Sequence, residues 1–234
     1  MSNLAIIPVR QGSKRLQKKN TRSFFGRPMF AYTLDAARES GLFDKIHVST
    51  ESEDVAKMCS EMGLSIDFMR PHELATDEAR LNDVCAYIIK EYGQRGFRFD
   101  NFCILWATAP MRTAEDIQKA YSMLKDDVEA VIGVSDYNRP VYVGQKIDEN
   151  GNLTPLFSDM LRQPRSKMPK VICDNGSMCW VRTEAHKKHD TWLPPKLKGY
   201  YMPRYRSVDI DTQEDWDWAE YCYTHYFNKT STPG

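Results

Sequence analysis

The sequence lacks several features that would indicate a membrane, secreted or nucleic-acid-binding protein. No apolar run approaches the length of a membrane span, and the N-terminus lacks the basic, apolar and small-residue segments of a signal peptide. Basic and acidic residues number 32 each, so no overall charge would draw the chain to nucleic acid or to an anionic membrane. We therefore expect a cytoplasmic protein that binds neither nucleic acid nor membrane.

The cysteines lack the spacing of a metal site or a disulfide framework. There are six, none of them in a CxxC pair, and several lie within apolar runs. Reduced thiols in the core are therefore expected, rather than disulfides or zinc ligands. No internal repeat or low-complexity linker divides the 234 residues, a length that suits one sizeable domain.

What the first 135 residues do contain is an alternation of short apolar runs and helical patterns. Strands are expected at 4–9, 45–50, 64–69, 101–106 and 130–135. Helices are expected at 28–41, 52–63, 81–93 and 114–125. This order is typical of βα units on a largely parallel sheet, so the fold class is α/β.

The pattern changes in the second half of the chain. Tyrosine, valine and glycine alternate over residues 139–157, and Asn150-Gly151 is a strong hairpin signal. We expect a β-rich arm at about 137–182 that protrudes from a single domain spanning 1–228.

The C-terminal part adds a strand expected at 171–181 and, over 206–227, a strand followed by an amphipathic helix. Residues 229–234 are expected to form a disordered tail. The segment "HKKHD" carries His186 and His189 three residues apart, which would suit a metal site, but so polar a stretch favours a solvated loop.

Positive charge is concentrated directly after the first expected strand. Five of the fourteen residues from Ile7 to Asn20, "IPVRQGSKRLQKKN", are basic. Ligands of an open α/β sheet bind beyond the carboxyl ends of its strands, where this loop lies. Gly12 and Ser13 keep the backbone small enough for amide N–H groups to approach an anion. The charged side chains available there are Arg10, Lys14, Arg15 and Lys19.

This loop predicts a triphosphate site, and the alternative is a solvated basic loop. It matches neither the GxxxxGK[ST] pattern of a P-loop nor the GxGxxG pattern of a dinucleotide fold. A second feature, far along the chain, favours the functional interpretation.

That feature is the acidic pair in "VDID". On an extended segment Asp209 and Asp211 project from one face, while Val208 and Ile210 point into the core. Two such carboxylates can hold Mg²⁺ together with substrate phosphates. Helix capping is the alternative, because Asp211 or Thr212 would suit the N-cap of the following helix, but capping does not explain Asp209.

Six motifs, in chain order, resemble those of one family. They are "IPVRQGSKRLQKKN", "FDKIHVSTESEDVA", "FMRPHELATD", "ATAPMRTAEDI", "QPRSKMPKVICDNGS" and "SVDIDTQEDW". Together they cover nearly the whole chain and resemble the acylneuraminate cytidylyltransferases, also called CMP-sialic acid synthetases.

The resemblance implies a Rossmann-like nucleotidyltransferase: a mostly parallel sheet flanked by helices, with a small β-rich arm that dimerises. It implies that CTP reacts with a nonulosonic, nine-carbon 2-keto sugar acid to give the CMP-sugar and pyrophosphate. Mg²⁺ is the implied cofactor and a homodimer the implied assembly. The sequence offers no obvious general base.

The resemblance also assigns residues by position. The nucleotide-binding residues are Arg10, Gly12, Ser13, Lys14, Lys19, Asn20, Arg70, Thr76 and Asp77. The candidate catalytic residues are Arg10, Lys19 and Asp211, and the metal ligands are Asp209 and Asp211. The sugar-side residues are Trp106, Thr108, Tyr142, Arg165, Asn175 and Cys179. Arg165 would meet the sugar carboxylate, and some contacts would come from the partner subunit.

Three sugar-side positions depart from the family pattern. Trp106 stands where the sialic acid enzymes usually have glutamine, Tyr142 where they have lysine, and Cys179 where they have tyrosine. A pocket that loses an amide and an ammonium and gains an indole suits a less hydroxylated sugar. Pseudaminic and legionaminic acids, which are deoxy and N-acylated, fit that description. Pseudaminic acid is the first choice of acceptor because the pseudaminic acid cytidylyltransferases also lack the glutamine. The alternatives are that Trp106 is a core aromatic residue at the end of a strand and that Tyr142 and Cys179 pack within the arm.

Two alternatives stay open. The chain could be a cytidylyltransferase for another acid, such as an octulosonate or a phosphonate. It could also be a non-catalytic nucleotide-binding protein, which the basic loop alone would allow.

Overall fold

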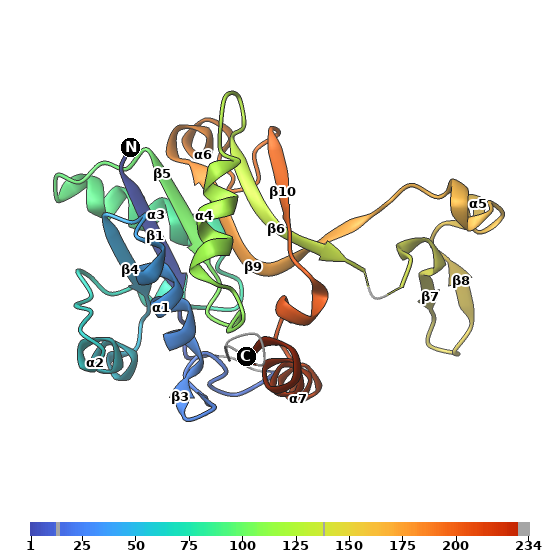
Figure 1. Ribbon diagram of the computed structural model, residues 1–234, viewed down its shortest axis with the longest axis horizontal. Coiled ribbons are helices and arrows are strands. Elements are labelled where there is room, and N and C mark those ends of the chain that lie inside the picture. The colour runs from blue at the N-terminus through green and yellow to red at the C-terminus, as the bar shows by residue number, and fades with distance from the viewer. Residues whose placement is uncertain (13–14, 138, 229–234) are drawn as a thin grey trace, which may run out of the picture.

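The structure, a computed structural model that describes residues 1–12, 15–137 and 139–228, is built around a six-stranded sheet. Its strands are β1 (Asn3–Pro8), β4 (Lys45–Ser49), β5 (Asn101–Leu105), β6 (Ala130–Asp136), β9 (Ile172–Arg182) and β10 (Leu197–Tyr201). Their order across the sheet is β10-β6-β9-β5-β1-β4 (Figure 1). Neighbours are parallel except at β9, which is antiparallel to both β5 and β6. The expected mostly parallel α/β sheet is confirmed.

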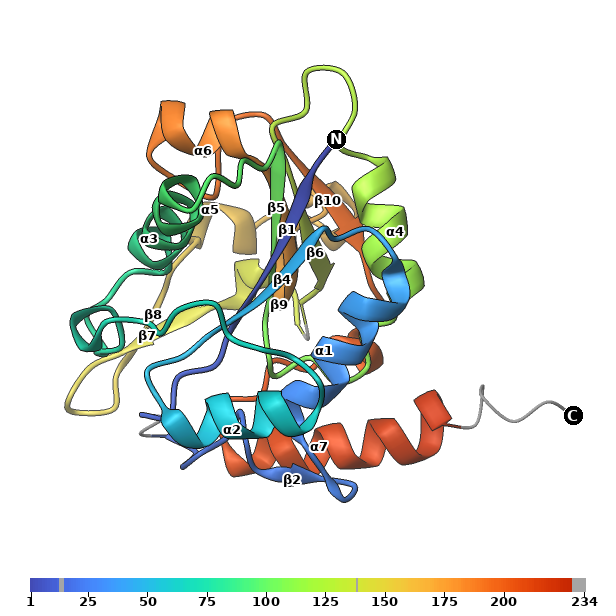
Figure 2. The same cartoon turned by 90° about the vertical axis from the view of Figure 1, so that its left-hand side faces the viewer.

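Helices cover both faces of this sheet. The helices are α1 (Met29–Ser40), α2 (Glu53–Glu61), α3 (Leu81–Gln94), α4 (Ala114–Ser122), α5 (Ser158–Leu161), α6 (Thr183–His189) and α7 (Gln213–Cys222), which continues as a π-helical turn over Tyr223–Phe227. Of these, α5 lies on the projecting arm, away from the sheet (Figure 1). Viewed along the sheet edge, α3 and α6 lie on one face and α1 and α4 on the other (Figure 2). No helix in the described part of the chain is long and apolar enough to cross a bilayer.

Short elements complete the described structure. Two small antiparallel ladders pair β2 (Ser23–Phe24) with β3 (Arg27–Pro28) and β7 (Gln145–Ile147) with β8 (Leu153–Pro155). Single 3₁₀ turns lie at His72–Leu74, Val141–Val143, Arg165–Lys167 and Arg204–Arg206.

The core follows from the alternation of side chains along the buried strands. Leu4 and Ile6 of β1 pack on the face that α3 covers, and Ala5 and Ile7 pack on the face that α1 and α4 cover. A strand buried on both faces must be apolar at every position, which is why β1 could be predicted. All six cysteines are free thiols, and all but Cys173 are buried.

The arm projects from the carboxyl end of β6 and returns through β9 (Figure 1). Its β7–β8 hairpin turns at Gly151, which has a positive φ of 81°. Asp148 caps this turn by accepting hydrogen bonds from the backbone amides of Asn150 and Asn152. The predicted hairpin is confirmed.

Two expected strands do not form. Residues 64–69 place Ile66 and Phe68 against the core without pairing to the sheet, and Phe68 instead stacks on His47 of the edge strand β4. Residues 207–211 also lack a strand partner, although Val208 and Ile210 are buried as expected because they pack in the cluster under α7.

Several elements were not predicted, among them the short β2, β3 and α5 and the longer β10 and α6. The edge strand β10 is largely exposed, so it lacks the apolar run that identifies buried strands. The "HKKHD" segment ends helix α6 rather than forming a solvated loop. Its His186 is 3% exposed and shares a hydrogen bond of 2.9 Å with Asn82. The predicted tail at 229–234 lies outside the described residues.

Candidate active site

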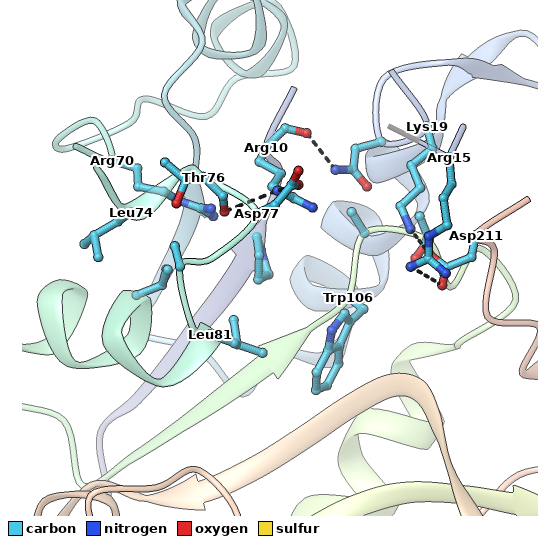
Figure 3. Close-up of a pocket in the computed structure, with 16 residues that line it drawn as sticks. Arg10, Arg15, Lys19, Arg70, Leu74, Thr76, Asp77, Leu81, Trp106 and Asp211 are labelled. Carbon is cyan, nitrogen blue, oxygen red and sulfur yellow. Dashed lines mark hydrogen bonds and ion pairs between the residues drawn. The ribbon is translucent and has the colours of Figure 1, made fainter. Parts of the chain in front are cut away.

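A cavity of about 550 Å³ lies at the carboxyl ends of β1 and β5 (Figure 3). The loop after β1 contributes Arg10, Arg15, Lys19 and Asn20; the segment before α3 contributes Arg70, Thr76 and Asp77; the turn after β5 contributes Trp106 and Thr108. Asp211 enters from the segment that leads into α7. The sheet thus brings the basic loop and one of the two aspartates into one cavity, as the strand-end argument expects.

Asp211 is held by two cations of the basic loop. The Lys19 ammonium lies 2.6 Å from its Oδ1, and the Arg15 guanidinium lies 2.8 Å from its Oδ2. Lys19 also donates to the backbone carbonyl of Ile210 at 2.9 Å. These contacts join residues 191 and 192 positions apart, so the loop and the C-terminal segment are packed as one unit.

Arg10 ties the same loop to the segment before α3. Its Nη1 lies 2.7 Å from Oδ1 of Asp77 and donates to the carbonyl of Thr76 at 3.3 Å. Asn20 donates to the carbonyl of Arg10 at 2.9 Å and so fixes where the loop leaves the strand. The carboxylates of Asp77 and Asp211 therefore pair with the cations that would bind an entering polyanion.

Arg70 adds a buried positive charge at the floor of the cavity. It is 5% exposed and donates to the hydroxyl and carbonyl of Ser49, at 2.9 and 2.8 Å. Burial lowers its pKa to about 10, so the guanidinium stays charged at neutral pH.

Of the remaining nucleotide-side predictions, Gly12 is described but is not required by packing, since a Cβ there would meet nothing within 4 Å. Such open space allows a ligand to approach the backbone closely. Ser13 and Lys14 lie outside the described residues.

Asp209 lies in a second cavity of about 360 Å³, which Asp174, Asn175, Arg204 and Trp218 also line. Its carboxylate lies over Gly176, where an added Cβ would come within 2.9 Å of it. Partial burial, followed by the negative charge of Asp211, raises the pKa of Asp209. The two predicted metal ligands are thus electrostatic neighbours, but they line adjoining cavities rather than one.

The sugar-side predictions are dispersed. Trp106 and Thr108 line the first cavity, and Asn175 lines the second, where it donates to the Ser135 hydroxyl at 3.2 Å. Tyr142 and Arg165 line a third cavity of about 270 Å³ at the base of the arm. In a single chain these two residues lie away from the first cavity.

Cys179 is not brought to any of these three cavities. It points into the core between its sheet neighbours Ile104 and Ile132, is fully buried, and its thiol pKa is raised by that burial. The prediction of a sugar contact was carried over from its place in the sequence alone. Its side chain faces the core cluster under α3, so in this chain it has a packing role.

Trp192 is a site neighbour that was not predicted. Its ring lies edge-on to that of Trp106, with 5.5 Å between centroids and 64° between planes. Leu74, Leu81 and Val84 line the same cavity and pack in one cluster with Trp106, so its indole belongs to an apolar wall of this cavity. In the sequence, Trp192 is only an isolated aromatic residue in a polar stretch, so nothing there indicated that it lies next to the site.

Comparison with known proteins identifies relatives along the whole chain. The family model described as cytidylyltransferase matches residues 4–166. A pseudaminic acid cytidylyltransferase of Campylobacter jejuni is 28% identical over 225 residues, covering 95% of this chain and 97% of the relative. A CMP-N,N'-diacetyllegionaminic acid synthase of Legionella pneumophila is 30% identical over 230 residues, covering 94% and 95%. An N-acylneuraminate cytidylyltransferase of Streptococcus agalactiae is 30% identical, covering 92% of this chain and 52% of the longer relative.

Solved structures agree with the fold. A CMP:2-keto-3-deoxy-manno-octonic acid synthetase complexed with CTP has a TM-score of 0.70 at 14% identity, covering 96% of this chain and 99% of the other. A 4-diphosphocytidyl-2C-methyl-D-erythritol synthase from Anaerococcus prevotii has a TM-score of 0.62 at 15% identity, with the same coverage. At these identities the similarity shows the architecture alone.

Proposed function

The chain belongs to the cytidylyltransferase family, and from this premise we propose that it transfers CMP from CTP to a nonulosonic 2-keto sugar acid in the cytoplasm. The anomeric hydroxyl of the sugar acid attacks the α-phosphorus of CTP. A new P–O bond to the sugar forms, and the bond from the α-phosphorus to the oxygen that bridges it to the β-phosphorus breaks. Pyrophosphate leaves with that electron pair, and the hydroxyl proton is released to solvent. The observation that supports this best is the meeting of Arg10, Arg15 and Lys19 with Asp211 in one cavity.

The residues of the first cavity suit a triphosphate by charge and by position. Arg15 and Lys19 would exchange the carboxylate of Asp211 for phosphate oxygens, and Arg10 would do the same with Asp77. Phosphoryl transfer needs positioning and charge stabilisation rather than a covalent nucleophile. These cations provide both at the developing pyrophosphate.

The acidic residues fit Mg²⁺ as a cofactor shared with the substrate. No group of three metal-binding side chains forms within the described residues. Mg²⁺ is typically bound by one or two carboxylates together with water and substrate phosphates, so phosphate oxygens and water would complete the coordination. Burial first, and then the negative charge of Asp211, raises the pKa of Asp209. A divalent cation bound there would favour the ionised carboxylate. Asp209 and Asp211 would hold the ion from adjoining cavities, and when bound it would stabilise charge on the leaving pyrophosphate.

The acceptor side is completed, in this proposal, by a second copy of the chain. Tyr142 and Arg165 lie on the projecting arm and line a cavity of their own. A homodimer in which each arm reaches the partner's active site would bring the guanidinium of Arg165 to the sugar carboxylate. Exposed apolar side chains on the arm, Ile147, Leu153 and Leu156, support burial against another surface.

We propose pseudaminic acid as the acceptor, with legionaminic acid next. The apolar wall formed by Trp106, packed edge-on against Trp192, suits a deoxy, N-acylated sugar better than a fully hydroxylated one. Relatives named for pseudaminic, legionaminic and sialic acids have almost the same sequence identity to this chain, so sequence identity does not favour one acceptor. The choice is supported by the apolar wall at Trp106.

The test is pyrophosphate release from CTP and Mg²⁺ with a panel of pseudaminic, legionaminic, sialic and octulosonic acids. We expect release only with a nonulosonic acid, fastest with pseudaminic acid, and a CMP-sugar detected by mass spectrometry. Stimulation by octulosonic acid alone, or by none of the four acids, would refute the proposed reaction.

A further inference from the structure

Arg112 is a buried arginine without a carboxylate partner in the described part of the chain. It lies between β5 and α4 and is 2% exposed. Its Nε and Nη2 are buried and make no hydrogen bond to any described residue. Burial lowers its pKa to about 10, so it remains a cation at neutral pH. Burying a cation in this way is unfavourable for stability unless its contacts compensate.

Asp116, a carboxylate whose negative charge acts on Arg112, is already engaged elsewhere. Its Oδ1 accepts hydrogen bonds from Arg206 at 2.6 Å and from Tyr200 at 2.9 Å. Its Oδ2 caps α4 by accepting from the backbone and hydroxyl of Thr113. Since Arg206 balances the charge of Asp116, charge neutralisation does not explain why Arg112 is an arginine.

The contacts that Arg112 does make are to two backbone carbonyls at the edge of the active site. Its Nη1 donates to the carbonyl of Ser177 in β9 and to the carbonyl of Trp106, the latter at 3.3 Å. The Trp106 amide also donates to the Ser177 carbonyl at 3.1 Å, and the Thr33 hydroxyl donates to the Trp106 carbonyl at 3.1 Å. One nitrogen therefore fixes the point where β5 ends against β9.

Both of these backbone positions lead directly to the acceptor side. Trp106 and Thr108 line the first cavity. The Ser177 hydroxyl donates at 2.6 Å to Oδ1 of Asn175, which lines the second. Arg112 thus supports the walls of two adjoining cavities from beneath, without lining either of them.

We propose that Arg112 is a positioning residue that fixes the Trp106–Thr108 segment and the Asn175–Ser177 segment relative to each other, and so sets the acceptor geometry. The inference rests on the proposed function, because the acceptor is the sugar acid of that reaction. Nucleotide binding relies on the loop after β1 and on Asp211, which Arg112 does not contact. A displaced wall should therefore weaken use of the sugar acid and leave CTP binding nearly unchanged.

The test compares Arg112→Met with a matched control, Arg182→Met. Arg182 also donates to backbone carbonyls, those of Val128 at 2.8 Å and Leu124 at 3.2 Å, but it lies at the opposite end of β9. We expect Arg112→Met to lower kcat/KM for the sugar acid by roughly tenfold or more, with the KM for CTP changed by less than about threefold. Arg182→Met should change neither by more than about threefold.

Two further readouts distinguish bonding from packing. Arg112→Lys keeps a cationic donor, so it should recover most of the sugar-acid kcat/KM that Arg112→Met loses. Hydrogen exchange of the Trp106 amide should be faster in Arg112→Met than in Arg182→Met, a measurement that needs no catalysis. If Arg112→Met does not fold, Arg112→Gln and Arg182→Gln, which shorten the side chain and remove its charge but keep a polar group, are compared by the same exchange measurement. Faster exchange at Trp106 in the Arg112 variant is expected.

The positioning role would be overturned if Arg112→Met and Arg182→Met had equal kcat/KM for the sugar acid. It would also be overturned if Arg112→Lys had no higher kcat/KM than Arg112→Met. Equal Trp106 exchange in a matched pair of variants would overturn it as well. The unmodified chain is assayed first: if it fails to use any nonulosonic acid, the proposed function fails, and the exchange result still decides whether Arg112 fixes this segment.

Discussion

The nucleotide side and the acceptor side of the proposed active site differ in how much of each a single chain supplies. Arg10, Lys19 and Asp211 line one cavity. Lys19 forms a direct ion pair with Asp211, although the two come from opposite ends of the sequence. The acceptor residues are instead distributed over three cavities, and two of them, Tyr142 and Arg165, lie on the arm. A single chain thus builds the proposed nucleotide site, and we expect a second copy to complete the site for the sugar acid.

The largest effect should come from the nucleotide side. Asp211→Asn removes the carboxylate that holds Lys19 and Arg15 and that would ligate Mg²⁺. We expect a loss of about a hundredfold or more in kcat for pyrophosphate release. Asp217→Asn, at an exposed carboxylate of α7, is the control and should stay within about threefold of the unmodified chain. A similar small loss in both variants would remove Asp211 from the mechanism.

Arg165→Ala should impair binding of the sugar acid, and the defect should be partly relieved in a dimer with a second variant chain. We expect the KM for the sugar acid to rise roughly tenfold or more, because a charged bond to the carboxylate is lost. Mixing this variant with Asp211→Asn should then restore up to about a quarter of the unmodified activity, since a hybrid dimer contains one intact site. Activity no higher than the sum of the two variants measured separately would place Arg165 outside a shared site.

Trp106→Gln should change which acceptor is preferred rather than whether the reaction occurs. Replacing the indole with an amide removes apolar surface opposite Trp192 and adds a hydrogen-bonding group. We expect the ratio of kcat/KM for pseudaminic acid to that for sialic acid to fall by about tenfold. The KM for CTP is the internal control, and an unchanged acceptor ratio would refute the role of the apolar wall.

The last effect concerns stability rather than catalysis, at the sheet edge next to the nucleotide side. Burial lowers the pKa of His47 in β4 to about 3, although the negative charge of Asp67 opposes this, whereas the unfolded chain has a value near 6.5. As the pH falls below 6.5 the unfolded state takes up a proton that the folded state does not. Stability should therefore decline between pH 6.5 and 3, by at most about 1.4 kcal/mol per pH unit.

Chemical denaturation of His47→Gln against the unmodified chain measures this contribution. The variant lacks the titrating ring, so its stability should fall less steeply over the same pH range. Parallel pH profiles for the two proteins would show that another group causes the acid sensitivity.

The sequence predicted best those parts in which one physical constraint acts on every residue. The strands β1, β5 and β6 are buried on both faces, so their apolar runs are unambiguous. Residues 64–69 have a similar composition, but their side chains reach the core without main-chain pairing. The edge strand β10 is held mainly by its ladder to β6, and its exposed side chains carry no apolar signal.

The same contrast applies to the site. The basic loop could be placed because parallel strands direct their carboxyl ends to one edge of the sheet. The face to which Cys179 points could not be derived from an aligned position, because in a strand a shift of one residue changes the face. The role of Arg112 could not be predicted either, since its contacts are to backbone carbonyls that come together only in the fold.

The central claim is that the cations after β1 and the distant aspartate act together on one polyphosphate through a divalent ion. Calorimetric titration of CTP, with and without Mg²⁺, into the unmodified chain and into Asp211→Asn tests it most directly. We predict that Mg²⁺ tightens CTP binding to the unmodified chain by about tenfold or more and has little effect on the variant. Equal Mg²⁺ dependence in the two proteins would contradict the claim.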